Sequence, residues 1–285
     1  MKIKIAKNAG FCFGVRRAID IAEKTAKRKF KVYTLGPIIH NPQEVGRLKK
    51  QGIETLKNPK KVKGGFIILR THGIPFELHK KLEENKSINI IDATCPFVKR
   101  AQNIVKQLST DIKSSDKTII LVGEKVHPEV VALVSYGNEK CVVIENIREA
   151  KKFKGCGDLN IVSQTTQTPK NFNNIVKVLK KRYKTKVYNT ICKATLDRQK
   201  SAEKLATSVD LMIVVGGKNS GNTRRLAQIC SAKIQTYHIE TVNSLKEKWF
   251  KNIESVGLTA GASTPNWIVK EIEGIIKKIG EKRTC

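Results

Sequence analysis

Three cysteines occupy similar places in three successive stretches of this 285-residue chain. Cys12 lies between Gly10-Phe11 and Phe13-Gly14, Cys95 comes just before a proline, and Cys192 follows a short polar stretch. A cysteine at a strand-to-helix turn has backbone N–H groups nearby, and these stabilise the charge of a thiolate. Three such thiols suit an iron–sulfur cluster or a zinc ion with an open position. The alternative is three unrelated buried cysteines.

A weak internal repeat favours a shared cluster over three unrelated cysteines. Each cysteine is followed by a strand-like run that ends in a glycine, and a polar residue comes soon after that glycine; these polar residues are His40, His127 and Ser220. A second strand-like run then ends in further polar residues, among them His72, Thr165 and Ser263. Ligands of open α/β sheets bind beyond the carboxyl ends of the strands. The repeat therefore predicts three units around a pseudo-threefold axis, which bring three thiols and six polar positions to one centre.

The polar residues of these loops are typical of an anion site. Three histidines at one centre would donate hydrogen bonds to an anion, with help from helix N-termini, whereas capping of the next helix is the simpler alternative. The turn Ser220-Gly221-Asn222 stands between a strand and a helix and suits a phosphate, although it is no Walker A loop. Ser263 lies in a similar turn, and on its own it would be interpreted as a helix cap.

One carboxylate stands out near these loops. Glu129 comes two residues after His127 and would open the next helix. It is either a favourable charge at a helix N-terminus or a proton donor beside a reducible substrate. Glu124 is the competing carboxylate.

Strands alternate with helices along the whole chain, which predicts an α/β fold with parallel sheets covered on both faces. The expected strands are 31–35, 66–69, 88–91, 118–122, 141–144, 160–162, 211–215, 234–239 and 256–259, and residues 1–6 also alternate like a strand. The expected helices are 15–29, 42–51, 75–85, 96–110, 169–183, 197–208, 222–232 and 265–279.

Composition narrows the possible partners. The net charge of +30 suggests an acidic partner, but most of the cations are lysines scattered over helix faces. Aromatic residues make up only 6% of the chain, and no basic–aromatic ladder for stacking bases is present. The apolar runs are strand-length and the N-terminus has no signal-peptide core, so we expect a cytoplasmic protein that binds neither nucleic acid nor membrane. The remaining cysteines, Cys141, Cys156, Cys230 and Cys285, are expected to be structural.

An ordered set of motifs, spread over essentially the whole chain, resembles the 4-hydroxy-3-methylbut-2-enyl diphosphate reductase family. The motifs are Ala9-Gly10-Phe11-Cys12-Phe13-Gly14-Val15, Gly36-Pro37-Ile38-Ile39-His40-Asn41, Arg70-Thr71-His72-Gly73, Asp92-Ala93-Thr94-Cys95-Pro96, His127-Pro128-Glu129, Gln164-Thr165-Thr166, Lys218-Asn219-Ser220 and Thr259-Ala260-Gly261-Ala262-Ser263. Members of the family often carry a second serine where this chain has Gly221, so only a backbone N–H is expected there.

The resemblance implies a three-lobed α/β protein around a central [4Fe–4S] cluster. The implied lobes are residues 1–94 with Cys12, His40 and His72, residues 95–191 with Cys95, His127 and Thr165, and residues 192–285 with Cys192, Ser220 and Ser263. The three lobe cysteines would hold the cluster. The substrate-binding residues would be His40, His72, His127, Thr165, Ser220, Gly221, Asn222 and Ser263.

The implied reaction is the reductive dehydroxylation of an allylic diphosphate to isopentenyl and dimethylallyl diphosphate, the last step of the methylerythritol phosphate pathway. Glu129 would deliver protons, and a ferredoxin or flavodoxin would supply electrons, since no nicotinamide or flavin fingerprint is present. Two alternatives remain open. One is a hydrolyase that uses iron as a Lewis acid without redox chemistry, and the other is a nucleic-acid-binding protein, which the charge alone suggests.

Overall fold

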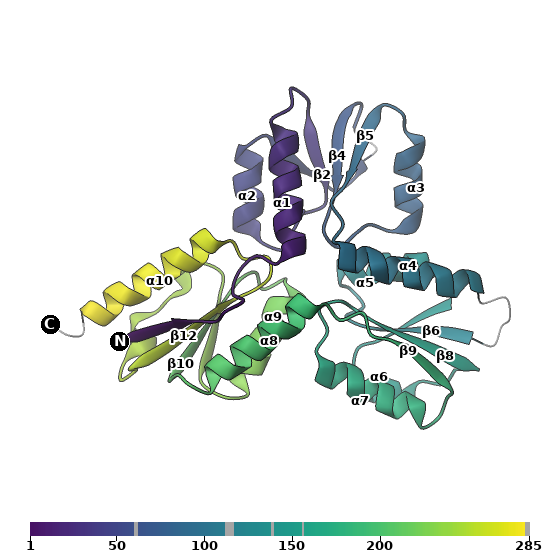
Figure 1. The fold of residues 1–285 in the computed structure, drawn as a ribbon. Coiled ribbons are helices and arrows are strands. Elements are labelled where there is room, and N and C mark those ends of the chain that lie inside the picture. Colours follow the sequence, from purple (N-terminus) through teal and green to yellow (C-terminus); the bar gives the residue numbers. More distant parts are fainter. Residues whose placement is uncertain (60–61, 112–116, 138–139, 156, 283–285) are drawn as a thin grey trace. The chain divides into compact units, whose positions relative to one another are not determined.

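The computed structural model describes all residues except 60–61, 112–116, 138–139, 156 and 283–285, so Cys156 and Cys285 lie outside the described residues. The described chain forms three four-stranded parallel sheets with helices between the strands, which confirms the α/β expectation (Figure 1). The strands are β1 (Lys2–Ile5), β2 (Val32–Leu35), β3 (Ile53–Leu56), β4 (Gly65–Leu69), β5 (Ile88–Asp92), β6 (Lys117–Val122), β7 (Cys141–Ile144), β8 (Asp158–Ser163), β9 (Thr185–Tyr188), β10 (Leu211–Val215), β11 (Thr236–Ile239) and β12 (Ser255–Ala260). The helices are α1 (Phe13–Ala26), α2 (Pro42–Lys50), α3 (Phe76–Glu84), α4 (Pro96–Asp111), α5 (Pro128–Tyr136), α6 (Ile147–Lys152), α7 (Pro169–Lys180), α8 (Lys193–Ala206), α9 (Gly221–Ser231) and α10 (Asn266–Glu281), with short 3₁₀ turns at Val242–Ser244 and Glu247–Phe250.

The three sheets share one strand order. They run β3-β2-β4-β5, β7-β6-β8-β9 and β11-β10-β12-β1, and every pairing is parallel. We call β2, β6 and β10 the first strands of their sheets, β3, β7 and β11 the second strands, and β4, β8 and β12 the third strands. In each sheet the first strand lies between the second and the third, and a fourth strand pairs with the third. The repeat that the sequence suggests is thus a repeat of the same sheet topology.

The N-terminal strand β1 is the fourth strand of the C-terminal sheet. It pairs with β12 in the register Lys2↔Ser255 to Ile5↔Leu258, and so takes the place that β5 and β9 have in the other sheets. In line with this pairing, the chain divides into two compact units. The first contains residues 1–16, 40–47 and 193–285, and the second contains residues 17–39 and 48–192. The three lobe boundaries, and an arrangement of the lobes about an axis, stay predictions.

Strand β10 illustrates why the sheets form here. All five of its residues are buried, because helices cover both faces of the sheet. Side chains alternate along a strand, so Ile213 packs into a cluster with Ile272 of α10, whereas Met212 packs with Leu226 of α9 in a cluster on the other face. Among the helices of the described chain, none is both long enough and apolar enough to cross a bilayer.

Some elements differ from the sequence expectations. Strands β3 and β9 were not expected, because both lie at sheet edges, where most of their residues are partly exposed and show little apolar pattern. Helix α5 begins at Pro128, next to Glu129, which was expected to open a helix, and most of its residues are apolar. Helix α6 was not expected, because it is too short to show a clear helical period. Helix α8 begins at Lys193 instead of residue 197, and this earlier start places Cys192 directly before the helix.

Candidate functional site

The three predicted ligand cysteines share one local structure. Cys12, Cys95 and Cys192 each stand directly before the first residue of a helix, namely α1, α4 and α8. Each is partly exposed and forms no disulfide. The first turn of a helix presents unpaired N–H groups and the positive end of the helix dipole, and both stabilise a thiolate or the negative charge of a metal–sulfur centre.

The backbone N–H of each cysteine also makes the same hydrogen bond. The acceptor is a carbonyl oxygen two residues after the end of β4, β8 or β12. Cys95 donates to Thr71 at 3.0 Å, Cys192 to Thr165 at 2.9 Å, and Cys12 to Ala262 at 3.1 Å. This repeated contact ties every cysteine to a loop in which the sequence predicts substrate-binding residues. The three cysteines thus have equivalent positions in the repeated topology, and that they bind one metal centre stays a prediction.

Two other cysteines pack among apolar side chains; Cys230 is buried, and Cys141 is partly exposed. Burial raises the pKa of the Cys141 thiol to about 12, and burial together with nearby Glu203 raises the pKa of Cys230 to about 12. Both groups therefore stay protonated at neutral pH, and a protonated thiol is a poor metal ligand. The structural role that the sequence assigns to these two cysteines fits this chemistry.

In the first unit, predicted binding residues gather at the start of α9 and after β12. The Ser220 side chain caps α9 by accepting from the Thr223 N–H at 3.3 Å, and Gly221 is the first residue of that helix. Asn222 is buried, and among the described residues neither its amide nitrogen nor its amide oxygen has a hydrogen-bond partner. The Ser263 hydroxyl donates to the His40 carbonyl oxygen at 3.1 Å. A buried amide with both atoms unpaired is costly, and a polar ligand would satisfy it.

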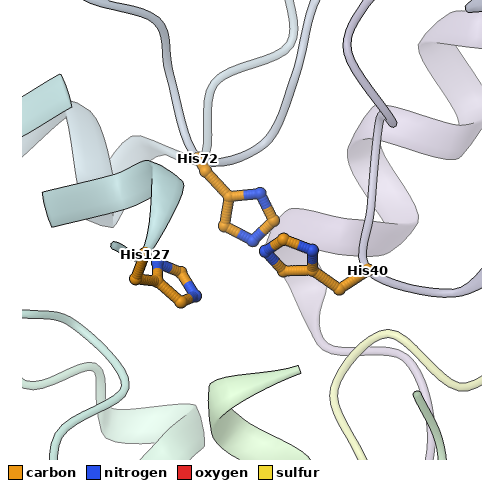
Figure 2. Close-up of side chains that lie close together, drawn as sticks. All are labelled: His40, His72 and His127. Atoms are coloured by element: carbon orange, nitrogen blue, oxygen red, sulfur yellow. The ribbon is translucent and has the colours of Figure 1, made fainter. Parts of the chain in front are cut away.

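In the second unit, His72 and His127 lie side by side. Their ring centroids are 5.4 Å apart and the rings meet edge to face (Figure 2). His127 caps α5, where its Nδ1 accepts a hydrogen bond from the Glu129 N–H at 3.1 Å. In a neutral ring the proton is then on Nε2, which makes that nitrogen a donor for an anion.

Both oxygens of the Glu129 carboxylate accept hydrogen bonds from Thr165. Its Oε1 accepts from the Thr165 N–H at 2.6 Å, and its Oε2 accepts from the Thr165 hydroxyl at 2.8 Å. Both residues are buried, with 1% of Glu129 and 4% of Thr165 exposed. The competing Glu124 is only partly buried, and its backbone N–H donates to the side chain of Gln164. Of the two carboxylates, Glu129 is therefore the buried one, and its role stays a prediction.

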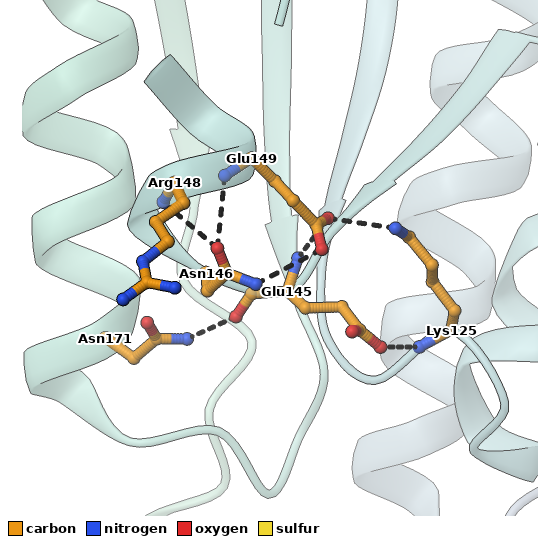
Figure 3. Close-up of polar contacts among 6 residues, drawn as sticks. All are labelled: Lys125, Glu145, Asn146, Arg148, Glu149 and Asn171. Carbon is orange, nitrogen blue, oxygen red and sulfur yellow. Dashed lines mark hydrogen bonds and ion pairs between the residues drawn. The ribbon is translucent and has the colours of Figure 1, made fainter. Parts of the chain in front are cut away.

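A polar network holds the loop that carries His127 and Glu129. The Glu145 carboxylate accepts from the Lys125 N–H at 2.6 Å, and Glu149 forms an ion pair with the Lys125 ammonium at 3.0 Å (Figure 3). In the same way, the Glu240 carboxylate beside the C-terminal sheet accepts a hydrogen bond from the Lys218 N–H at 2.7 Å. Glu145 and Glu240 each follow a second strand, and this repeated position is a signal that the sequence analysis missed.

The predicted site residues therefore form two groups. Cys12, His40, Ser220, Gly221, Asn222 and Ser263 belong to the first unit, and His72, Cys95, His127, Glu129, Thr165 and Cys192 belong to the second. Within each group, the contacts described above join loops that are far apart in the sequence. That both groups meet at one centre, and the role of each residue, stay predictions.

Comparison with known proteins supports the motif resemblance. The model of the LytB protein family matches residues 3–277. The chain belongs to the LytB family.

Relatives that carry a reductase name match nearly the whole chain. The protein named 4-hydroxy-3-methylbut-2-enyl diphosphate reductase from Pelobacter propionicus is 45% identical over 99% of this chain and 100% of its own length. The one with the same name from Aquifex aeolicus is 47% identical over 98% of this chain and 97% of its own length.

Two solved structures are also similar. One is that of (E)-4-hydroxy-3-methyl-but-2-enyl diphosphate reductase, described as the terminal enzyme of the non-mevalonate pathway, with a TM-score of 0.69, 46% identity, and coverage of 97% of this chain and 99% of that chain. The other is the Plasmodium falciparum reductase, with a TM-score of 0.89, 29% identity, and coverage of 96% of this chain and 87% of that chain. Both structures therefore share the fold of this chain over nearly its whole length.

The LytB chain also contains a charge that stabilises the turn before Cys95. Burial alone would raise the pKa of Asp92, but hydrogen bonds from Lys99 and Thr94 outweigh burial and lower this pKa. The Asp92 carboxylate accepts from the Thr94 N–H at 2.9 Å and from the Lys99 ammonium at 2.5 Å. A lowered pKa means that the ionised group stabilises the fold, so this stabilisation is present above about pH 4 and is lost as the pH falls through the folded-state pKa.

Replacement of Asp92 by asparagine is expected to lower the free energy of unfolding by about 1 kcal/mol at pH 7. The difference from the wild type should shrink as the pH falls below about 4, because the wild-type carboxyl group is then protonated as well. Urea unfolding at several pH values measures both effects. An equal loss at pH 3 and pH 7 would show that the charge of Asp92 is not what stabilises this turn.

Proposed function

We propose that this chain reduces (E)-4-hydroxy-3-methylbut-2-enyl diphosphate to isopentenyl and dimethylallyl diphosphate. The observation that carries the proposal is the position of Thr165 between two kinds of site residue. Its N–H and hydroxyl donate to the buried Glu129 carboxylate, and its carbonyl accepts from the N–H of Cys192. The proposed proton donor and a predicted metal ligand are thus joined through one loop, which suits a reaction that couples electron transfer to proton transfer.

Cys12, Cys95 and Cys192 would hold the [4Fe–4S] cluster. Helix N-termini at all three thiols suit a negatively charged metal–sulfur centre, and cluster sulfur needs such N–H groups nearby. When bound, a cluster with three cysteine ligands supplies electrons and one iron that is open to a substrate oxygen.

The diphosphate would be bound by neutral donors. Ser220 and Asn222 of the first unit, together with the Gly221 N–H at the α9 N-terminus, provide hydroxyl, amide and backbone donors. The Ser263 hydroxyl donates to the His40 carbonyl oxygen, so Ser263 would bind the anion through its backbone N–H. His40, His72 and His127 add imidazole N–H groups. Charge-assisted hydrogen bonds of this kind are strong and orient an anion, so they fix the hydroxylated end of the substrate with respect to Glu129.

Glu129 would deliver protons to the reaction. The conversion replaces a C–O bond by a C–H bond, and it consumes two electrons and two protons while the oxygen leaves as water. A buried carboxyl group held in one orientation by Thr165 is suited to protonate the leaving oxygen. The allylic fragment can take up the second proton at either end, which yields the two isomeric products.

The test is anaerobic turnover of the hydroxylated diphosphate by reconstituted protein with and without a low-potential reductant. We expect both five-carbon diphosphates with the reductant and neither without it. A hydrolyase that uses iron only as a Lewis acid would dehydrate the substrate without any reductant. Loss of water from the substrate without the reductant, giving a dehydrated diphosphate in place of the two isomers, would therefore overturn the proposal in favour of that alternative.

We further propose an acidic ferredoxin or flavodoxin as the electron donor. The chain carries a net charge of +30, which attracts an acidic partner and accelerates its association. Electrostatic attraction of this kind weakens as salt screens the charges.

A further inference from the structure

His40 lies in a segment that belongs to a different unit from its neighbours in the sequence. Residues 40–47 group with the C-terminal sheet in the first unit, although strands β2 and β3, which precede and follow this segment, belong to the second unit. Specific contacts must therefore hold the segment against the C-terminal part of the chain. These contacts determine where His40 lies with respect to Ser220, Asn222 and Ser263 of the same unit.

The first contact is at His40 itself. The Ser263 hydroxyl donates to the His40 carbonyl oxygen at 3.1 Å. The same oxygen would lie only 2.7 Å from a Cβ atom added to Gly217, so a residue with a side chain at that position would push the segment away.

The second contact is made by a buried carboxylate on α2. Glu44 is 1% exposed, and its Oε2 accepts from the indole N–H of Trp267 at 3.2 Å. Its Oε1 accepts from Nε of Arg47 at 3.0 Å and from Nη2 at 2.5 Å. The Glu44 N–H donates to the Asn41 side chain at 2.8 Å, which connects the carboxylate to the residue next to His40.

Trp267 is an unusual partner for this carboxylate. It lies in the first turn of α10, it is 46% exposed, and its N–H nevertheless reaches a buried anion on another helix. A buried carboxylate that loses one of its donors is strongly destabilised. The segment would then have to shift so that water can reach the unpaired oxygen.

We propose that Trp267 and Glu44 are positioning residues, which fix His40 beside the phosphate-binding loops and thereby set the affinity for the diphosphate group. The inference rests on the proposed function, because it assumes that His40 binds the diphosphate. Neither residue touches the substrate. Their hydrogen bond acts through Asn41 and the first turn of α2.

The test compares two phenylalanine variants of the holoenzyme. Trp267→Phe keeps an aromatic ring and removes only the N–H that binds Glu44. We expect the Kd for inorganic diphosphate and the KM for the substrate to rise about tenfold, and kcat to change by less than about twofold, since loss of a hydrogen bond to a charged group costs about that much in affinity.

Trp249→Phe is the matched control. Trp249 stacks on Tyr237, with ring centroids 3.8 Å apart, and a phenylalanine can keep this stacking. The chain has two tryptophans, so this variant also leaves Trp267 as the single indole. Its fluorescence is expected to change when inorganic diphosphate is added, and a purely structural role of Trp267 would not produce that change.

Combining Glu44→Gln with Trp267→Phe tests whether the two residues affect diphosphate binding through the same contact. If Trp267 and Glu44 act through one contact, the double variant should bind diphosphate no more weakly than the weaker of the two single variants. Wild-type affinity in Trp267→Phe, or an equal loss in Trp249→Phe, would overturn the inference. A wild-type protein that binds no diphosphate would instead overturn the proposed function, and the inference with it.

Discussion

Replacement of Glu129 by glutamine is expected to lower kcat by about 10²- to 10⁴-fold, the usual contribution of a general acid. Glutamine has the same shape, and its oxygen can still accept one hydrogen bond from Thr165. It cannot accept the second bond with its NH₂ group, and it has no acidic proton to give to the leaving oxygen. Binding of the diphosphate should change little, so KM is expected to stay within about threefold. Steady-state turnover with a low-potential reductant measures both constants.

Glu124→Gln is the control for this experiment. Glu124 is a neighbouring carboxylate in the same loop, and its backbone N–H binds Gln164. Its side chain is only partly buried, so the substitution should leave kcat near the wild-type value. If Glu124→Gln is inactive while Glu129→Gln is active, the proton donor has been assigned to the wrong residue.

The choice between these two carboxylates marks the limit of what the sequence could predict. Both lie a few residues after a buried strand, and the repeat alone left them as competitors. The difference arises from a contact with Thr165, which is far away in the sequence and meets Glu129 only because β6 and β8 are neighbours in the sheet. Local sequence pattern contains no information about such a pairing.

The same distinction between local pattern and distant pairing explains which features of the strands the sequence could predict. Leu211–Val215 was predicted with its observed bounds, since a fully apolar run must be buried on both faces of a parallel sheet. Residues 2–5 were also expected to form a strand, but their partner β12 lies at the other end of the chain. Because strand pairing over such a distance depends on the whole fold, the sequence could not show that β1 completes the C-terminal sheet.

The loops were the most predictable part of the site. Glycines and helix-starting residues mark the strand ends, and functional residues of α/β folds gather there. The contact between Glu44 and Trp267 is the opposite case. Nothing about a glutamate in the first turn of a helix distinguishes it from a favourable surface charge, and only the structure shows that it is buried.

Replacement of Cys95 or Cys192 by serine is expected to abolish stable iron binding and, with it, turnover. Both thiols lie at helix N-termini, and their N–H groups bind the loops that carry His72 and Thr165. A serine hydroxyl preserves these backbone contacts but is a much poorer ligand for iron than a thiolate. The variants should therefore fold, with unchanged thermal melting of the protein without iron, and fail to hold the metal. Iron content per chain and visible absorbance after anaerobic reconstitution are the measurements.

Cys141→Ala and Cys230→Ala serve as controls, because burial raises the pKa of both thiols to about 12 and keeps them protonated. These variants should bind as much iron as the wild type, although the loss of buried sulfur lowers their stability. The difference between the two sets of cysteines follows from environment alone: one set lies at partly exposed helix N-termini, and the other in apolar packing. Full iron content in Cys95→Ser and Cys192→Ser, with depletion in Cys141→Ala, would mean that the positions of the thiols in the fold do not determine which of them bind iron.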